Sequence, residues 1–422
     1  MSAANFPETV VRYADKALAK SLGLPTDDAD WIKHFGRFEP LPGTLQEPLA
    51  LRYHGHQFRH YNADLGDGRG FLFAQLYDAK GRLLDLGTKG SGQTPYSRRG
   101  DGRLTLLGGV REVLATRYLE HMGMNTSRTL SLVETGEDLV RGDEPSPTRS
   151  AVMVRCNHSH IRFGTFQRHA YLENKGGLEA LIHYCQTHFY PDAQNGADLL
   201  EQVSLASADM VAGWMAGGFV HGVMNTDNMN ITGESFDYGP YRFLPTLKSG
   251  LTAAYFDHNG LYAFARQPDA MYWNLAQLAQ SLSLVVDDQA LIKALESFSS
   301  AYQTALRDQV FRRLGLQPKS LEQDTDFVLS TFRLLEESQV SWPQFWHDWQ
   351  GGAPRDEALY GDVFKDWKND YSAYTVIAAK PKTDQPASLI YEEIGALWKP
   401  IAESDDWSAF EDKLKTYQRA PE

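Results

Sequence analysis

Short runs of hydrophobic residues separated by glycine-rich turns dominate the chain from about residue 49 to residue 134. The stretch GRGFLFAQLYDAKGRLLDLGTK, residues 68–89, predicts two strands joined by a turn at Ala79-Lys80-Gly81, with Lys89 ending the second strand. In residues 105–123, hydrophobic positions recur at spacings of four, as at Val110 and Leu114, which predicts a helix that ends at Gly123.

The pattern becomes helical from about Gly177, and a long apolar helix is expected from Asp198 to about Gly218. Residues 288–350 also favour helices, with the tryptophans near their end packed together. Gly, Pro and Asp interrupt residues 351–384, which predicts a mobile connection there. These patterns indicate an α+β fold with a strand-rich first lobe and a mainly helical second lobe. The expected regions are a nucleotide-binding lobe at 1–150, a helical lobe at 151–350 and a C-terminal helical extension at 351–422.

Composition narrows the classes of partner. The 422 residues include 41 basic and 54 acidic side chains, a net charge of −13, which argues against nucleic acid or an anionic membrane as the main partner. The two cysteines, Cys156 and Cys185, are far apart, so neither a disulfide framework nor a zinc knuckle is expected. No apolar run is long enough to span a membrane, and residues 1–27 lack a secretory pattern, so we expect a cytoplasmic protein.

Three elements of a nucleotide-triphosphate site follow one another in the order that such a site needs. The turn LGDGRG, residues 65–70, lets backbone approach phosphate, and Lys89 and Glu112 follow, 23 residues apart, on a strand end and on a helix. Any one of these elements is weak evidence, because a short glycine-rich turn before a strand is more often only a hairpin. The order of the three favours the nucleotide site.

The stretch HGVMNTDNMNITGESFDYGP, residues 221–240, resembles the catalytic loop of kinases, with Asn228 seven residues after His221. We expect residues 229–231 to form a strand that turns at 233–234 and brings Asp237 beside Asn228, as a pair of magnesium ligands. The alternative is two capping residues in a tight hairpin. A kinase would have its catalytic base at Val223. Asp227 is the carboxylate within reach, so either the chemistry differs or the site only binds nucleotide.

Together these residues resemble the selenoprotein O family of pseudokinases. The resemblance rests on GHQF (55–58), LGDGRG (65–70), KGSGQTPYSRRGDGR (89–103), VREVLAT (110–116), SHIRFGTF (159–166), residues 221–240, and YAFARQP with WNL within 262–275. It implies a protein-kinase-like bilobal fold and transfer of AMP from ATP to Ser, Thr or Tyr hydroxyls of proteins, including this protein itself. It also implies a nucleotide bound in reverse relative to kinases.

The resemblance assigns a role to each matching position. It implies ATP contacts from Gly66, Gly68, Arg69, Lys89, Asp101, Gly102 and Asp237, a supporting contact from Glu112 to Lys89, and terminal-phosphate contacts from Arg155 and Arg162. It implies that Asn228 and Asp237 bind Mg2+, with Mn2+ as an alternative, and that Asp227 accepts the proton. We expect a monomer whose partners are ATP and substrate proteins.

One departure and two alternative functions stay open at this stage. Arg59 follows GHQF where a glycine is expected, which leaves the local geometry undecided. A kinase-type phosphotransferase is the first alternative, because the other kinase elements are present. A non-catalytic, ATP-sensing pseudokinase is the second, because Val223 occupies the usual base position.

Overall fold

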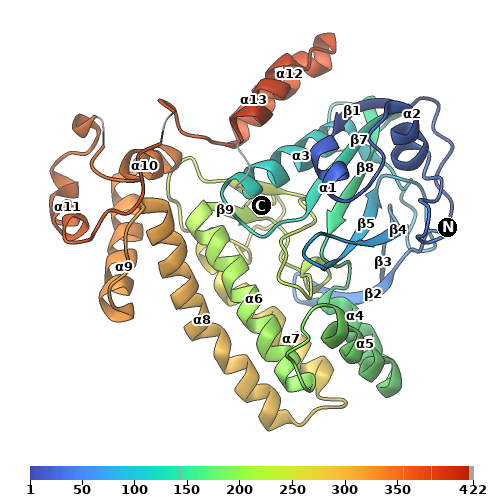
Figure 1. The fold of residues 1–422 in the computed structure, drawn as a ribbon, viewed down its shortest axis with the longest axis horizontal. Helices are drawn as coiled ribbons and strands as arrows, with labels where there is room; N and C mark the ends of the chain where they lie inside the picture. Colours follow the sequence, from blue (N-terminus) through green and yellow to red (C-terminus); the bar gives the residue numbers. More distant parts are fainter. Residues whose placement is uncertain (143, 355, 382, 418–422) are drawn as a thin grey trace.

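The computed structural model describes residues 1–142, 144–354, 356–381 and 383–417. Antiparallel strands make up much of the first part of the chain, and helices make up most of the second (Figure 1), which confirms the α+β class. The main sheet has the order β1-β7-β8-β5-β4, with β6 paired to β8, while β2 pairs with β3 and β9 with β10. The strands are β1 (Val10–Ala14), β2 (Arg52–Gln57), β3 (His60–Gly66), β4 (Leu72–Tyr77), β5 (Leu83–Lys89), β6 (Leu104–Thr105), β7 (Arg128–Leu139), β8 (Thr148–Asn157), β9 (Phe219–His221) and β10 (Tyr241–Phe243).

Both faces of the main sheet are buried. Ala151 and Met153 of β8 belong to the core cluster that includes α3 (Leu106–His121). The intervening Val152 and Val154 belong to a second cluster with Trp31. Because successive strand residues point to opposite faces, this alternation places α3 on one side of the sheet. The helices α1 (Lys16–Ser21), α2 (Asp28–Trp31) and η1 (Ile32–Gly36) cover the other side.

The strands and the helix predicted around Lys89 are confirmed. β4 and β5 form an antiparallel hairpin, and Lys89 is the last residue of β5. The helix α3 begins after Thr105, whose hydroxyl accepts a hydrogen bond from the backbone N–H of Gly108 at 3.0 Å. It ends at His121, two residues before Gly123, which adopts a φ of +77°. The packing of α3 on the sheet therefore places Glu112 next to Lys89.

The second part of the chain is built around α6 (Gly196–Gly217), which matches the predicted long apolar helix. Asn195 caps its start and Gly218, at a φ of +69°, ends it. Figure 1 shows α6 beside α8 in a group of long helices below the sheet. The other helices are α4 (Phe163–Tyr171), α5 (Lys175–His188), η2 (Thr226–Asn228), η3 (Phe264–Arg266), α7 (Gln267–Leu282), α8 (Asp288–Leu314), α9 (Leu321–Ser338), α10 (Trp342–Trp349), η4 (Glu357–Leu359), η5 (Asp362–Phe364), α11 (Lys365–Ser372), α12 (Tyr391–Ser404) and α13 (Ser408–Thr416).

The expectation of a loose connection over residues 351–384 is wrong for the described part of that segment. It contains η4, η5 and α11, and Trp367 of α11 packs on Trp349 with ring centroids 4.8 Å apart. The Trp367 indole donates to the Thr331 hydroxyl at 2.8 Å, and the Tyr371 hydroxyl donates to the Trp349 carbonyl at 2.8 Å. Burial of these aromatic rings outweighs the helix-breaking residues around them. The packing of the tryptophans of α10 is confirmed.

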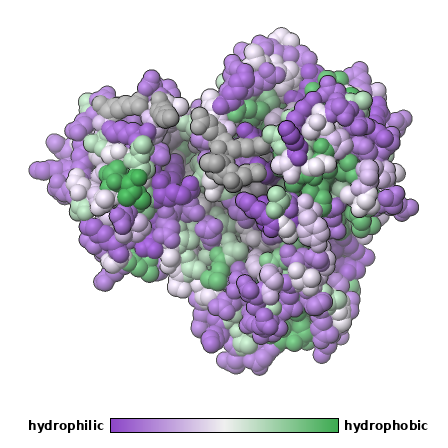
Figure 2. All heavy atoms as spheres, in the orientation of Figure 1, coloured by the Kyte–Doolittle hydropathy of each residue, from purple (hydrophilic) through white to green (hydrophobic). Residues whose placement is uncertain are grey.

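The division into regions 1–150, 151–350 and 351–422 stays a prediction, and β8 crosses the first boundary. Within the described ranges, no helix has the length and apolar character needed to cross a membrane. Figure 2 shows a mainly hydrophilic face with small, separate hydrophobic patches.

Candidate functional site

A pocket of about 650 Å³ lies between the glycine-rich turn after β3 and the loop after β5. Eight of its lining side chains are basic and three are acidic, in a chain whose net charge is −13. Such a concentration of positive charge attracts a polyanion into a cleft. The basic residues are Arg69, Lys89, Arg98, Arg99, Arg103, Arg141, Arg155 and Arg162, and the acidic ones are Asp67, Asp101 and Asp237.

Side-chain hydrogen bonds join the two loops that form this pocket. The Thr94 hydroxyl donates to the Asp67 carbonyl at 2.6 Å, and the Ser97 hydroxyl donates to the Gly68 carbonyl at 2.5 Å. A side chain at Gly66 would run into the ring of Tyr96. At Gly102 a side chain would collide with the facing backbone, and its φ of +71° also favours glycine. These glycines let the two backbones meet and keep the floor of the pocket open.

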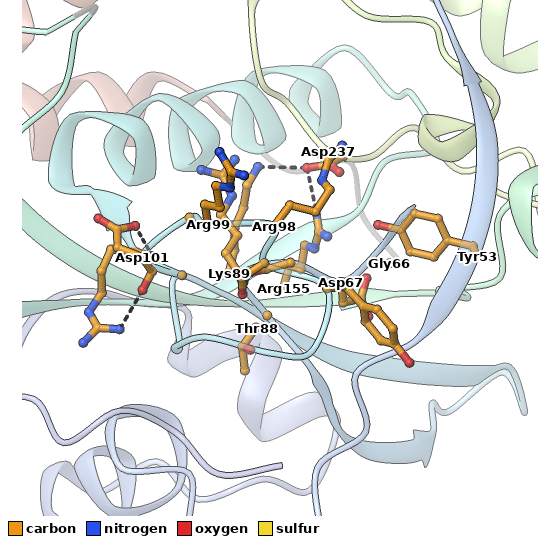
Figure 3. Close-up of a pocket in the computed structure, with 18 of the residues that line it drawn as sticks. Tyr53, Gly66, Asp67, Thr88, Lys89, Arg98, Arg99, Asp101, Arg155 and Asp237 are labelled. Atoms are coloured by element: carbon orange, nitrogen blue, oxygen red, sulfur yellow. Dashed lines mark hydrogen bonds and ion pairs between the residues drawn. The ribbon is translucent and has the colours of Figure 1, made fainter. Parts of the chain in front are cut away.

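Lys89, Asp237 and Arg155 form a charged cluster at the wall of the pocket. Figure 3 shows their side chains pointing toward one another, and the Lys89 ammonium lies 2.8 Å from Oδ1 of Asp237. The same ammonium contacts Glu112, while the Arg155 guanidinium lies 3.3 Å from Asp237. Burial opposes ionisation of Asp237, but the charges of Lys89 and Arg155 hold the pKa of that carboxyl well below its usual value. Asp237 is therefore a fixed negative charge.

Arg162 is a second fixed charge, and it is buried. Its guanidinium stacks over the ring of Tyr53 at 4.3 Å and lies 3.1 Å from the Asp67 carboxylate. It directly precedes α4, whereas Arg155 lies on β8, so two different elements present the two arginines to one pocket. Asp101 lies at the other end of this pocket in Figure 3, paired with Arg141 at 2.8 Å.

Asp227 lies on η2, beside the pocket and not in its lining. Burial raises its pKa to about 6. Its Oδ2 accepts a long hydrogen bond of 3.4 Å from the Gln57 amide, and Oδ1 has no hydrogen-bond partner in the described ranges. A carboxylate with a raised pKa and a free oxygen, next to a cationic pocket, is suited to accepting a proton. His221, by contrast, has its pKa lowered to about 4 by burial and stays neutral.

The hairpin expected between residues 229–231 and Asp237 is wrong. The backbone N–H of Ile231 donates to the Ile161 carbonyl at 2.9 Å, and Phe163 donates to Met229 at 3.0 Å. Ser235 pairs instead with Thr126. The backbone groups of this segment are thus satisfied by segments far away in the sequence, and the pairing of β9 with β10 closes a wide loop that carries both Asp227 and Asp237.

The expected magnesium ligands, Asn228 and Asp237, each keep a side-chain oxygen that accepts no hydrogen bond from the described residues. The Asn228 amide donates to the Val223 carbonyl at 2.9 Å, and no hydrogen bond from the described residues reaches its Oδ1. Asp237 uses Oδ1 for Lys89 and Arg155. Amide and carboxylate oxygens are hard donors of the kind that Mg2+ prefers when phosphates complete its shell, so the chemistry of these two residues suits the ion.

Sequence reasoning missed several residues of the pocket. Arg98 and Arg99 both line it, and both are non-glycine residues with positive φ, 49° and 83°. Neither forms an ion pair with the described residues, so both charges are available to an anion. Tyr53 and Asp67, which hold Arg162, were missed too. The consecutive arginines between glycines in residues 89–103 are a signal that could have identified the first two.

Known proteins resemble this chain over nearly all of its length. The family model described as protein adenylyltransferase SelO matches residues 1–418. A protein of Synechocystis sp. named protein nucleotidyltransferase YdiU is 43% identical, covering 99% of this chain and 94% of that protein. Proteins of the same name from Trichormus variabilis and Trichodesmium erythraeum are 41% and 42% identical, covering 99% and 98% of this chain.

Proposed function

The chain belongs to the SelO family of protein adenylyltransferases, and on that premise we propose that it transfers AMP from Mg2+-bound ATP to Ser, Thr or Tyr hydroxyls of proteins. The relatives are named protein nucleotidyltransferases, so this chain is a nucleotidyltransferase that uses a nucleoside triphosphate. The observation that supports the finer proposal is the juxtaposition of a cationic pocket with a buried carboxylate of raised pKa. We also propose that the sheet and the helical part are the two lobes of a kinase-like fold.

The pocket supplies groups for each part of ATP. Lys89, Arg155 and Arg162 offer positive charge to the phosphates, and the planar guanidinium groups suit a leaving pyrophosphate because they donate two parallel hydrogen bonds. Gly66, Gly68 and Arg69 border the same space, as do Gly102 and Asp101. A carboxylate such as Asp101 suits a hydroxyl or amine of the nucleoside better than a phosphate. Glu112 acts through Lys89, whose ammonium it contacts.

Asp227 acts as the base in this proposal. The acceptor hydroxyl gives its proton to the Asp227 carboxylate as its oxygen bonds to the α-phosphorus. The bond from that phosphorus to the bridging oxygen breaks, and its electron pair leaves with pyrophosphate. Asn228 and Asp237 would hold the Mg2+, which neutralises phosphate charge when bound. Because the pKa of Asp227 is raised to about 6, the carboxylate is ionised at pH 7 yet basic enough to take a proton.

ATP labelled at either end tests the proposal. The protein is incubated with Mg2+ and ATP labelled at the α-phosphate or at the γ-phosphate, and covalent label on protein is measured. We expect transfer of the α-label alone. Transfer of the γ-label would show a phosphotransferase, and ATP binding with no transfer would show a nucleotide sensor; either result contradicts the proposal.

A further inference from the structure

The turn between β2 and β3 rests directly on the loop that carries Asp227. The backbone N–H of His56 donates to the Thr226 hydroxyl at 2.7 Å, and that of Phe58 donates to Oδ1 of Asn225 at 2.9 Å. The Gln57 amide between them reaches Asp227 itself. The tip of the β2–β3 hairpin and the catalytic turn are therefore one assembly, although about 170 residues separate them in sequence.

The two residues at the tip of this hairpin are in an unfavourable backbone conformation. Phe58 and Arg59 have φ values of +50° and +64°, where glycine or asparagine is normally found. Strained residues of this kind persist where surrounding contacts hold them, and they concentrate at functional sites. Here the hydrogen bond to Asn225 and the stacking of Arg59 on Trp273, 5.3 Å from the ring centroid, hold the tip in place.

An aromatic ledge continues from this tip. We define the acceptor ledge as Phe58, Arg59, Tyr255 and Phe256. The rings of Phe58 and Phe256 are 5.6 Å apart, and 78% of Tyr255 and 44% of Phe256 are exposed. The exposed Arg59 guanidinium forms no ion pair with the described residues. The Tyr262 hydroxyl ties the ledge to the catalytic loop by donating to Asn225 at 2.9 Å.

The ledge and the nucleotide pocket lie at opposite ends of β2. Tyr53, near the start of the strand, lines the pocket, whereas Gln57, at its end, touches Asp227 and adjoins the ledge. The four residue steps from Tyr53 to Gln57 span roughly 13 Å of strand. A hydroxyl that approaches Asp227 from the side away from the nucleotide therefore arrives beside the ledge.

We propose that the acceptor ledge binds the substrate segment around the acceptor hydroxyl, with an apolar side chain on its rings and an acidic side chain on Arg59. This inference rests on the proposed function and adds a specificity determinant to it. Arg59 lies two residues beyond Gln57, so the acidic side chain is about two or three residues from the acceptor. The cation–π contact with Trp273 orients the guanidinium while its donors stay free for a carboxylate.

Peptides with a single acceptor hydroxyl, and Glu, Lys or Ala at each flanking position, test this proposal. For the wild type we expect the lowest KM with Glu at one position near the acceptor. Arg59→Glu should raise the KM for that peptide about tenfold and shift the preference to Lys. kcat at saturating peptide and Mg2+-ATP binding should stay at the wild-type level. Arg333→Glu on α9 is the matched charge control, because this exposed arginine is on a different element.

Two further measurements keep the outcome unambiguous. Fluorescence anisotropy measures binding of the same peptides to wild type and Arg59→Glu without any transfer reaction. If the protein did not transfer AMP, the binding preference for Glu could therefore still be tested. Arg59→Gly, which suits the positive φ, should fold normally and lose the preference for Glu. Equal responses of wild type and Arg59→Glu to all peptides would overturn the proposal. So would self-association that Arg59→Glu abolishes without changing peptide preference, because the ledge would then bind a second copy.

Discussion

The loop between β9 and β10 carries two aspartates whose surroundings differ: Asp227 is buried, whereas Asp237 lines the pocket and is partly exposed. Asp237 contacts Lys89 and Arg155, and its pKa is held well below the usual value. Among the described residues, the Asp227 carboxylate accepts one long side-chain hydrogen bond, from Gln57, and burial raises its pKa to about 6. The comparison teaches that the same side chain becomes a fixed charge at one end of the loop and, at the other, a carboxylate whose raised pKa suits the proposed role of base. The difference comes from the partners that the sheet and the β2–β3 hairpin bring to each end.

The largest effect is expected from Asp237→Ala, which removes the fixed charge. Lys89 and Arg155 lose their common partner, and the proposed metal loses a ligand. Transfer should fall by more than about a thousandfold, and calorimetry should show loss of Mg2+-ATP binding. Asp237→Asn is the control, because it keeps the size of the side chain and removes only its charge. Normal nucleotide binding by Asp237→Ala would show that this carboxylate is not part of the nucleotide site.

Lys89→Ala tests the cation at the same end of the loop. Removing it leaves phosphate charge uncompensated, so transfer should fall by about a hundredfold to a thousandfold. Glu112→Gln should be milder, because Glu112 contacts the lysine and does not line the pocket. Steady-state transfer rates of both variants, with thermal melting as the check on folding, give the answer. Near wild-type transfer by Lys89→Ala would refute the assigned pocket.

Asp227→Asn tests the other end of the loop. The transfer rate should fall by roughly a hundredfold, because a positioned base contributes about that much. Mg2+-ATP binding should remain, since the base acts on the proton of the acceptor. If the variant lost nucleotide as completely as Asp237→Ala, Asp227 would be a metal or structural ligand, and the contrast between the two aspartates would disappear.

The smallest effect is the dependence on pH. Since the base works only when ionised and the pKa of Asp227 is raised to about 6, kcat/KM should fall as the pH drops through 6. Well below pH 6, kcat/KM should fall at most about tenfold for each pH unit, because one proton inactivates the base. Asp237 should contribute no step near pH 6, because its pKa lies far lower. The profile of Asp227→Asn is the reference, and a matching fall in that variant would assign the titration to another group.

Local patterns in the sequence were sufficient for the elements that hold the pocket. The β4–β5 hairpin, the helix around Glu112 and the long α6 were predicted from hydrophobic spacing, turn residues and caps, which act over a few neighbours. The predicted hairpin after Asn228 does not form, because the backbone hydrogen bonds of residues 229–231 go to residues 161–163. No local sequence pattern reveals this pairing. The prediction for residues 351–384 failed for a related reason: aromatic packing between residues far apart in the sequence outweighed the local helix breakers.

The sequence by itself determined the α+β class, the order of Lys89 and Glu112, and the family to which the chain belongs. Only the tertiary structure decided how the two aspartates of one loop differ. Gln57 and Asp227 are 170 residues apart, and Lys89 and Asp237 are 148 apart. A pKa depends on burial and on charges within a few ångströms, and both are fixed only when distant segments pack together.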